Sequence, residues 1–374
     1  MTAPAWRWYN DVLGAPRFVC APMVRASELA FRLLTRELGC DLTFSPMLHA
    51  TELVAAAAAA PAGTDISLAF LDTSPADRPL IVQLCGNDPT ALAAAVQLVQ
   101  HRCDGIDLNL GCPQRCAEIG GFGAYLLEQP DTIVSIVRAM VAASNIPISC
   151  KIRLLPSLDE TIALAQGIQA AGCAMLTVHG RLRAQRHHEG VCNWDAIGAI
   201  RKAIAIPMLA NGGIRSRAEA EACLAATGCQ AVMAATGLLE NPSIFAVEPQ
   251  GIYDVALRYL AIVAEQPRTL YPTAARDHVL TMFRHKYRET DMDVFSVLGH
   301  HDVLLPAQLE AVLGHIAARN GDPPCTRYGT TLPTLRAIRY NAMTTTEDND
   351  TCADEQQDDD DDGLGFAWMG DDDA

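Results

Sequence analysis

The stretch Gly105-Ile-Asp-Leu-Asn-Leu-Gly-Cys-Pro113 decides the fold of this chain. Its first part, from Gly105 to the second leucine, alternates apolar and polar side chains, which indicates a short strand with one buried face. Gly111 lets the backbone turn sharply after that strand, and Pro113 stops the strand from continuing. Cys112 is therefore held on a turn at the strand's end, where a thiol can meet a ligand above the sheet. The alternative, a turn with an incidental cysteine, would be favoured if this stretch stood alone.

Similar apolar runs recur along the chain, with helical patterns between them. The other expected strands are Phe18–Met23, Leu42–Ser45, Leu80–Cys85, Ile148–Arg153, Met175–His179, Ile206–Ala210 and Ala231–Ala235. The expected helices are 27–38 with Ser27 as its cap, 89–101, 130–143, 159–171, 194–203 and 216–227, and the alanine run 55–60 is helical by propensity. Strands that each lead into a crossover fit a (β/α)8 TIM barrel far better than an open sheet.

Length and charge divide the chain into three parts. The 374 residues can bury one large core and an accessory domain. We expect a barrel domain over 1–250, a small helical domain over 251–345 and a disordered acidic tail over 346–374. Of the 44 acidic residues, 13 lie in 347–374, which leaves 31 against 28 Lys and Arg in the rest of the chain. The formal charge of −16 therefore belongs mainly to the tail and does not argue against a nucleic-acid partner.

The composition predicts a globular protein outside the membrane and the secretory route. Half of the residues are hydrophobic, yet no apolar run reaches membrane-spanning length, and the first residues lack the pattern of a secretory signal. Thirteen cysteines without paired spacing indicate reduced thiols. We therefore expect the cytoplasm, with the nucleus as an alternative, and no stable protein partner. Cys112 and Cys116 could begin a metal site, but no second Cys/His pair accompanies them, so no metal is expected.

Past residue 250 the apolar spacing becomes helical. The helices expected there are 253–263, 273–288, 306–318 and 332–342. One apolar stripe on the second helix consists of Val279, Leu280, Phe283 and Tyr287. Arg284, His285 and Arg288 fall on the opposite arc. An ordinary solvated face is the simplest explanation of this arc, but beside a phosphate-rich partner it would be a docking surface.

Polar or reactive groups follow nearly every expected barrel strand. They are Met23, Gln83, Asn109 with Cys112, Lys151, His179, Asn211 and Thr236. Because strand ends of such a barrel face one mouth, these groups are expected to converge there. The small residues of 210–214 and 234–237 follow the seventh and eighth strands, the usual phosphate position of this fold. A phosphate-bearing ligand over the mouth is therefore expected, with Lys151 placing a positive charge opposite its phosphate.

The assembled motifs resemble those of the tRNA-dihydrouridine synthase family over roughly residues 8–345. The matching motifs are Ala21-Pro-Met23, Ser27-Glu-Leu-Ala30, Ser45-Pro-Met-Leu-His49, Gln83 in Val-Gln-Leu-Cys, Asp107–Gln114, Lys151-Ile-Arg153, His179-Gly-Arg181 and Asn211-Gly212. Two stretches, Pro46–Ala50 and Cys112–Gln114, are similar to the eukaryotic 16/17-type subfamily, which acts on the tRNA D-loop. The family usually has Gly-Arg where this chain has Ala235-Thr236.

The resemblance implies FMN as the bound cofactor, NADPH as the electron donor and tRNA as the substrate. Residues implied to hold FMN are Pro22, Met23, Val24, Gln83, Lys151, His179, Asn211, Gly212, Gly213, Ala235 and Thr236. Residues implied to contact the RNA are Asn109, Arg181, Arg284 and Arg288. Cys112 would be the general acid. Reduction of uracil needs a hydride at C6 and a proton at C5, and a thiol that is protonated at neutral pH can supply that proton.

Two other functions compete with this interpretation. An FMN barrel that acts on a small molecule, similar to dihydroorotate dehydrogenase, would share the flavin residues but would have no use for a basic helical domain. A tRNA-binding scaffold with a dead site would have no use for Cys112, Lys151 and His179. Flavin absorbance would separate the scaffold from both enzymes, and activity on tRNA against orotate would separate the two enzymes.

Overall fold

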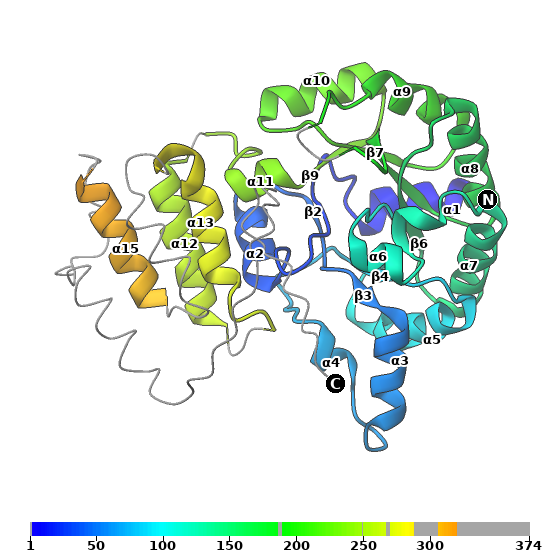
Figure 1. Ribbon diagram of the computed structural model, residues 1–374, viewed down its shortest axis with the longest axis horizontal. Helices are drawn as coiled ribbons and strands as arrows, with labels where there is room; N and C mark the ends of the chain where they lie inside the picture. Colours follow the sequence, from blue (N-terminus) through cyan, green and yellow to red (C-terminus); the bar gives the residue numbers. More distant parts are fainter. Residues whose placement is uncertain (1, 186–188, 249, 267–269, 288–305, 320–374) are drawn as a thin grey trace, which may run out of the picture. The chain divides into compact units, whose positions relative to one another are not determined.

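A computed structural model of the chain describes residues 2–185, 189–248, 250–266, 270–287 and 306–319. The chain divides into two compact units, Met1–Pro249 and Gln250–Ala374. The first unit contains every strand that the structure describes, and the second contains helices (Figure 1).

The first unit is a closed barrel of parallel strands. The barrel strands are β1 (Phe18–Cys20), β2 (Leu42–Phe44), β4 (Leu80–Cys85), β5 (Gly105–Leu110), β6 (Ile148–Leu154), β7 (Met175–Leu182), β8 (Met208–Asn211) and β9 (Ala231–Ala234). The strand order is β2-β1-β9-β8-β7-β6-β5-β4, and β2 also pairs with β4, which closes the circle. The predicted (β/α)8 barrel is confirmed. A two-residue strand that the sequence did not suggest, β3 (Leu48–His49), extends the edge of β4.

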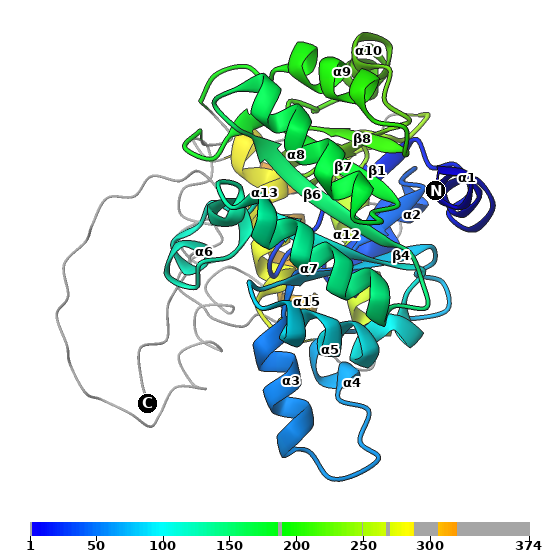
Figure 2. The same cartoon turned by 90° about the vertical axis from the view of Figure 1, so that its right-hand side faces the viewer.

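Helices surround the barrel on its outer side (Figures 1 and 2). They are α2 (Leu29–Glu37), α3 (Ala50–Ala59), α5 (Pro89–Val99), α7 (Pro130–Ala143), α8 (Leu158–Ala170), α9 (Trp194–Ala203), α10 (Arg217–Thr227) and α11 (Thr236–Glu240). Asp88, Ser157, Asn193 and Ser216 cap four of them with side-chain oxygens. The expected Ser27 cap is wrong. Glu28 caps α2 by accepting from the Phe31 amide at 3.1 Å, because the Ser27 hydroxyl is engaged with Met23.

The N-terminal segment closes the end of the barrel that the site does not use. It consists of α1 (Thr2–Arg7) and a π-helical turn, Trp8–Val12. The indole of Trp8 donates to the Asp104 carbonyl at 2.8 Å, and a Cβ on Gly105 would lie 2.5 Å from its ring. Gly105 is the first residue of β5, so Trp8 covers the amino ends of the strands. The carboxyl ends remain available for a ligand.

The second unit packs three described helices together. They are α12 (Ile252–Glu265), α13 (Ala274–Tyr287) and α15 (Pro306–Arg319). Val279, Leu280 and Phe283 of α13 are buried, as the apolar stripe predicted. The expected helix 332–342, the tail 346–374 and Arg288 lie outside the described residues.

Two searches of the described residues found nothing. In the ranges given above, no helix combines the length and the apolar character needed to cross a membrane. The same ranges bring no three His, Cys, Asp or Glu side chains together in a way that could hold a metal ion.

Candidate active site

The carboxyl ends of the strands bring the predicted site residues around one mouth. In the strand register Asn109 lies beside Lys151, and His179 lies beside Asn211. Gln83, Asn109 and Asn211 are buried, whereas Lys151 and His179 are partly exposed. These residues come from five different strands, and the barrel alone explains why they lie together. Their contacts with ligands stay predictions.

The turn that carries Cys112 is held from several sides. Asn109 Oδ1 accepts from the Gly111 and Cys112 amides at 3.1 and 3.0 Å. The Cys112 carbonyl accepts from the Ala124 amide at 3.0 Å. Gly123, with φ of +63°, packs so closely that a Cβ there would lie 2.8 Å from the Cys112 carbonyl oxygen. Cys112 is therefore a partly exposed thiol on a fixed backbone.

A second thiol affects the protonation of Cys112. Cys116, on α6 (Arg115–Ile119), is exposed and shares a side-chain hydrogen bond with Cys112. That hydrogen bond, and then burial, raise the pKa of Cys112 well above its ordinary value. The same bond lowers the pKa of Cys116 to about 6, because the Cys112 thiol donates to it. Cys112 therefore keeps its proton at neutral pH, while Cys116 carries the negative charge.

Cations gather on the β6 and β7 side of the mouth. Burial, followed by the charge of Arg153, lowers the pKa of Lys151 to about 8. Burial and the cations Lys151, Arg153 and Arg181 hold the pKa of His179 well below its ordinary value, so this ring is neutral at pH 7. Arg181 Nη1 lies 3.3 Å from His179 Nε2, and the buried Arg181 Nε has no hydrogen-bond partner. A group of cations with an unused donor favours an anionic ligand.

The turns after β8 and β9 leave the backbone accessible. Gly212 and Gly213 have φ of +109° and +77°, a region that other residues rarely adopt. A Cβ on Gly212 would also lie 2.7 Å from the His179 ring. Ala235 and Thr236 are partly exposed at the start of α11, which has no side-chain cap. These features fit the predicted position of a phosphate, although the structure contains no ligand that would test it.

The loop after β1 is fixed from beneath. Pro22, Met23 and Val24 are partly exposed there. The Met23 amide donates to Ser27 Oγ at 3.0 Å, and the Met23 carbonyl accepts from the Ser27 amide at 3.0 Å. The exposed Arg25 adopts a left-handed φ of +57° between them. The predicted flavin-lining residues therefore sit on a closed, hydrogen-bonded turn.

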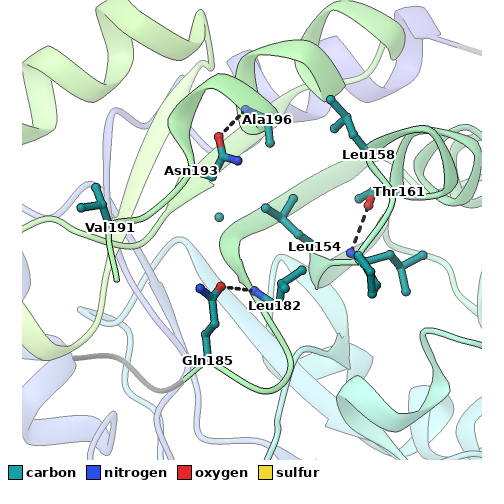
Figure 3. A pocket seen from close by; sticks show the side chains of 11 residues that line it. Leu154, Leu158, Thr161, Leu182, Gln185, Val191, Asn193 and Ala196 are labelled. Carbon is teal, nitrogen blue, oxygen red and sulfur yellow. Dashed lines mark hydrogen bonds between the residues drawn. The ribbon is translucent and has the colours of Figure 1, made fainter. Parts of the chain in front are cut away.

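An apolar cavity of about 300 Å³ lies outside this mouth, between the ends of β6 and β7 and the starts of α8 and α9 (Figure 3). Its polar neighbours bond within the protein: Gln185 Oε1 accepts from the Leu182 amide at 2.8 Å, and Asn193 Oδ1 accepts from the Ala196 amide at 2.9 Å. None of the predicted site residues lines it. We therefore place the chemistry at the barrel mouth.

Sequence analysis assigned no role to three residues that the structure places in the site. Asp107 is buried beneath Gln83 and Ser149. Arg153 donates from Nε to the Gly111 carbonyl at 2.9 Å and from Nη1 to the Leu182 carbonyl at 2.9 Å, so it ties two loops of the mouth together. Gly123 supports the Cys112 carbonyl. Asp107 and Arg153 each lie two residues from a predicted site residue, and this spacing places them on the same strand face.

In the second unit, Arg284 of α13 is partly exposed. Its predicted partner in RNA contact, Arg288, lies outside the described residues. The role of both arginines stays a prediction.

Comparisons with known proteins agree on one family. Residues 19–296 match the family described as "Dihydrouridine synthase (Dus)". The rat protein "tRNA-dihydrouridine(16/17) synthase [NAD(P)(+)]-like" is 41% identical over 281 residues, which cover 75% of this chain and 63% of the relative. The Saccharomyces cerevisiae protein "tRNA-dihydrouridine(16/17) synthase [NAD(P)(+)]" is 37% identical, with 73% and 67% covered. The human protein "tRNA-dihydrouridine(20a/20b) synthase [NAD(P)+]-like" is 42% identical, with 61% and 70% covered. The chain thus spans less than two thirds of the rat relative's length.

Proposed function

This chain belongs to the dihydrouridine synthase family and aligns with its 16/17-type members over most of its length, and from that premise we propose that it reduces uridine to 5,6-dihydrouridine in the D-loop of tRNA. NADPH would be the electron donor, and FMN the cofactor. The single observation that carries the proposal is the Cys112 thiol, which keeps its proton on a fixed turn beside a cationic mouth.

The residues of the mouth fit FMN, which carries a phosphate and an anionic ring when reduced. Gly212 and Gly213 leave room for a phosphate near the backbone, and the unpartnered Arg181 Nε can donate to an anion. Lys151 would hold the anionic side of the ring. FMN, when bound, supplies the hydride that reaches C6 of the uracil.

Cys112 would deliver the proton to C5 of the uracil. Its raised pKa keeps the thiol protonated across the neutral range, and its partial exposure lets a base approach. The uridine has to leave its stack to reach a thiol at a barrel mouth, so the enzyme would bind the RNA by shape and extrude the base.

The relatives' names favour tRNA over a small molecule as the substrate. The rat, yeast and human relatives are each named for tRNA-dihydrouridine synthesis. A dihydroorotate dehydrogenase-like reaction finds no support among them. The intact Cys112 and Lys151 argue against a scaffold with a dead site.

The proposal is tested with purified protein, NADPH and unmodified tRNA transcribed in vitro. We expect a yellow protein with about one FMN per chain, because one phosphate position follows the seventh and eighth barrel strands. Mass spectrometry of the digested tRNA should show dihydrouridine in the D-loop. A colourless protein that takes up no added FMN, or a flavoprotein that reduces orotate-type substrates and leaves tRNA unchanged, would contradict the proposal.

The affinity for FMN should depend on the charge of Lys151. The ammonium has a pKa of about 8, so its charge is present below that pH and is lost as the pH rises through it. Affinity for an anionic ligand should therefore fall by up to about tenfold for each pH unit above 8. Flavin fluorescence titrations between pH 7 and 9 would measure this, since Arg153 has a pKa of about 10 and stays charged.

Two variants of Lys151 separate its charge from other effects. Lys151→Arg keeps a cation at every pH in this range, so its affinity profile should be flat. Lys151→Ala should bind FMN more weakly near neutral pH and should also lack the decline. A wild-type slope in either variant would show that another group titrates.

The basic arc of α13 should contribute to tRNA binding. Arg284→Ala together with Arg288→Ala removes two positive charges, so tRNA affinity should fall and the salt dependence should flatten by about one unit of slope per lost phosphate contact, at most. NADPH oxidation by the bound flavin should not change. Filter binding at several salt concentrations would measure the effect, and an unaltered affinity would return the arc to an ordinary solvated surface.

A further inference from the structure

A hydrogen-bonded chain of side chains runs beneath Cys112 and begins at a buried carboxylate. Asp107 Oδ1 accepts from the Ser149 hydroxyl at 2.6 Å. Asp107 Oδ2 accepts from Gln83 Nε2 at 2.8 Å. Gln83 Oε1 accepts from Asn109 Nδ2 at 2.8 Å. The chain therefore links β4, β5 and β6 inside the barrel, directly below the mouth.

The upper end of this chain holds the backbone of the catalytic turn. Asn109 Oδ1 accepts from the Gly111 and Cys112 amides at 3.1 and 3.0 Å. Both ends of the Asn109 amide are thus used inside the protein. A flip of this amide would set its NH2 group against two backbone donors, which would leave the turn without an acceptor.

The carboxylate decides which way both amides point. An ionised Asp107 can only accept, so Gln83 must turn its NH2 group toward it and its oxygen away. Asn109 must then donate to that oxygen and present its own oxygen to the turn. A neighbour that could not accept would let the Gln83 amide flip, and the order of donors and acceptors up to Cys112 would no longer be set.

Asp107 itself cannot touch a ligand at the mouth. It has no exposed surface, and Gln83 and Asn109, at 1% and 8% exposure, lie between it and the turn. Burial raises the pKa of Asp107 to about 6, and the hydrogen bonds from Ser149 and Gln83 and the charge of Lys151 oppose that rise. The group is therefore ionised at neutral pH despite its burial. A charge that is costly to bury and sets the polarity of its neighbours is more than a packing residue.

We propose that Asp107 is a positioning residue that orients the Cys112 thiol through Gln83 and Asn109. This inference deepens the proposed function, on which it rests only for the role of the thiol. Asp107 makes no contact with substrate or cofactor in this arrangement. Its effect should reach the thiol only through the two amides.

The test compares two replacements of similar size. Asp107→Asn keeps an acceptor for Gln83 and can turn its NH2 group to the Ser149 hydroxyl, so the chain should survive. Asp107→Leu offers no acceptor. In FMN-loaded Asp107→Leu, the rate of Cys112 alkylation by iodoacetamide should change by about tenfold or more, and kcat for dihydrouridine formation should fall by about 10²-fold, as for a misplaced catalytic group. The KM for tRNA should stay near that of the wild type.

Peptide mapping gives the alkylation rate of each thiol separately. Trypsin cleaves after Arg115, so Cys112 and Cys116 fall in different peptides. Ser149→Ala is the matched control, because it removes one hydrogen bond to Asp107 and leaves the amide order intact. In this variant and in Asp107→Asn, Cys112 should react at close to the wild-type rate. Equal changes in Asp107→Asn and Asp107→Leu would overturn the proposal.

A double variant tests whether the effect travels through Asn109. In an Asn109→Ala background the chain is already broken, so adding Asp107→Leu should change Cys112 alkylation no further. Independent, multiplying effects would overturn the proposal. If Asp107→Leu does not fold, Gln83→Met interrupts the same chain and should alter Cys112 alkylation in the same way. Because alkylation is measured without tRNA, a wild-type protein that makes no dihydrouridine would contradict the proposed function and leave this test intact.

Discussion

Replacement of Cys112 by alanine is expected to slow the reduction of tRNA by a factor of about 10²–10⁴, the usual loss when a general acid is removed. FMN should remain bound, because Cys112 is not among the residues that fit its phosphate or ring. Reduction of the bound flavin by NADPH should also be normal, since that half-reaction needs no proton at the uracil. Stopped-flow measurement of the two half-reactions separates these effects.

Two further variants make this test specific to proton delivery. Cys112→Ser keeps the size and a donor, but a hydroxyl is a much weaker acid than a thiol, so tRNA reduction should also be slow. Cys116→Ala should be close to wild type at neutral pH, because burial still raises the pKa of Cys112. Normal reoxidation of the Cys112→Ala flavin by tRNA would mean that another group delivers the proton.

The partnership of the two thiols adds a pH signature. An acid must be protonated to act, so the raised pKa of Cys112 extends its active range toward alkaline pH. Cys116→Ala removes the largest cause of that rise, and the alkaline decline of tRNA reduction should then begin at a lower pH than in the wild type. A profile that is identical in both proteins would show that Cys116 does not act on the Cys112 proton.

Local patterns predicted the barrel well where side chains alternate plainly. β4 and β5 have the predicted bounds, because a turn follows each apolar pattern at once. β7 was expected to end at His179 but continues to Leu182. Gly180 and Arg181 suggested a turn, yet Arg181 is buried inside the barrel and Leu182 pairs with Leu154. A polar residue that faces a polar barrel mouth cannot be told from a loop residue by hydropathy.

The site was predictable as a set of strand ends and not as a set of bonds. The position of Cys112, Lys151 and His179 around one mouth follows from the fold, which local patterns reveal. The contact of Cys112 with Cys116 and the bond from Gln83 to Asp107 depend on side-chain directions across different elements. Such contacts leave no period in the sequence, so only the structure could supply them.

The largest loss of stability is expected from Asp77→Ala. Asp77 and Arg32 are both almost fully buried, and Arg32 Nη2 lies 2.7 Å from Asp77 Oδ2. Arg36 adds a second guanidinium 3.6 Å from Asp77, and the Thr43 hydroxyl lies 3.4 Å away. Removal of the carboxylate strands a buried cation, which costs about 3–5 kcal/mol of unfolding free energy. Urea denaturation would measure this large share of the roughly 5–15 kcal/mol that stabilises a typical domain.

The pair also supports the mouth, so its loss should reach the cofactor. Arg32 Nη1 donates to the Ser27 carbonyl at 2.6 Å, and Ser27 in turn holds the Met23 loop. Asp77→Ala should therefore lower FMN occupancy as well as stability.

Two comparisons show whether the stranded charge is the cause of this loss. Asp77→Ala combined with Arg32→Met removes both charges and should regain much of the stability, because the cost lies in the unpaired cation. Glu221→Ala breaks the exposed Arg17–Glu221 pair at 2.7 Å and should cost at most about 1 kcal/mol. A loss in Asp77→Ala no larger than in Glu221→Ala would show that the buried pair does not hold α2 against the barrel.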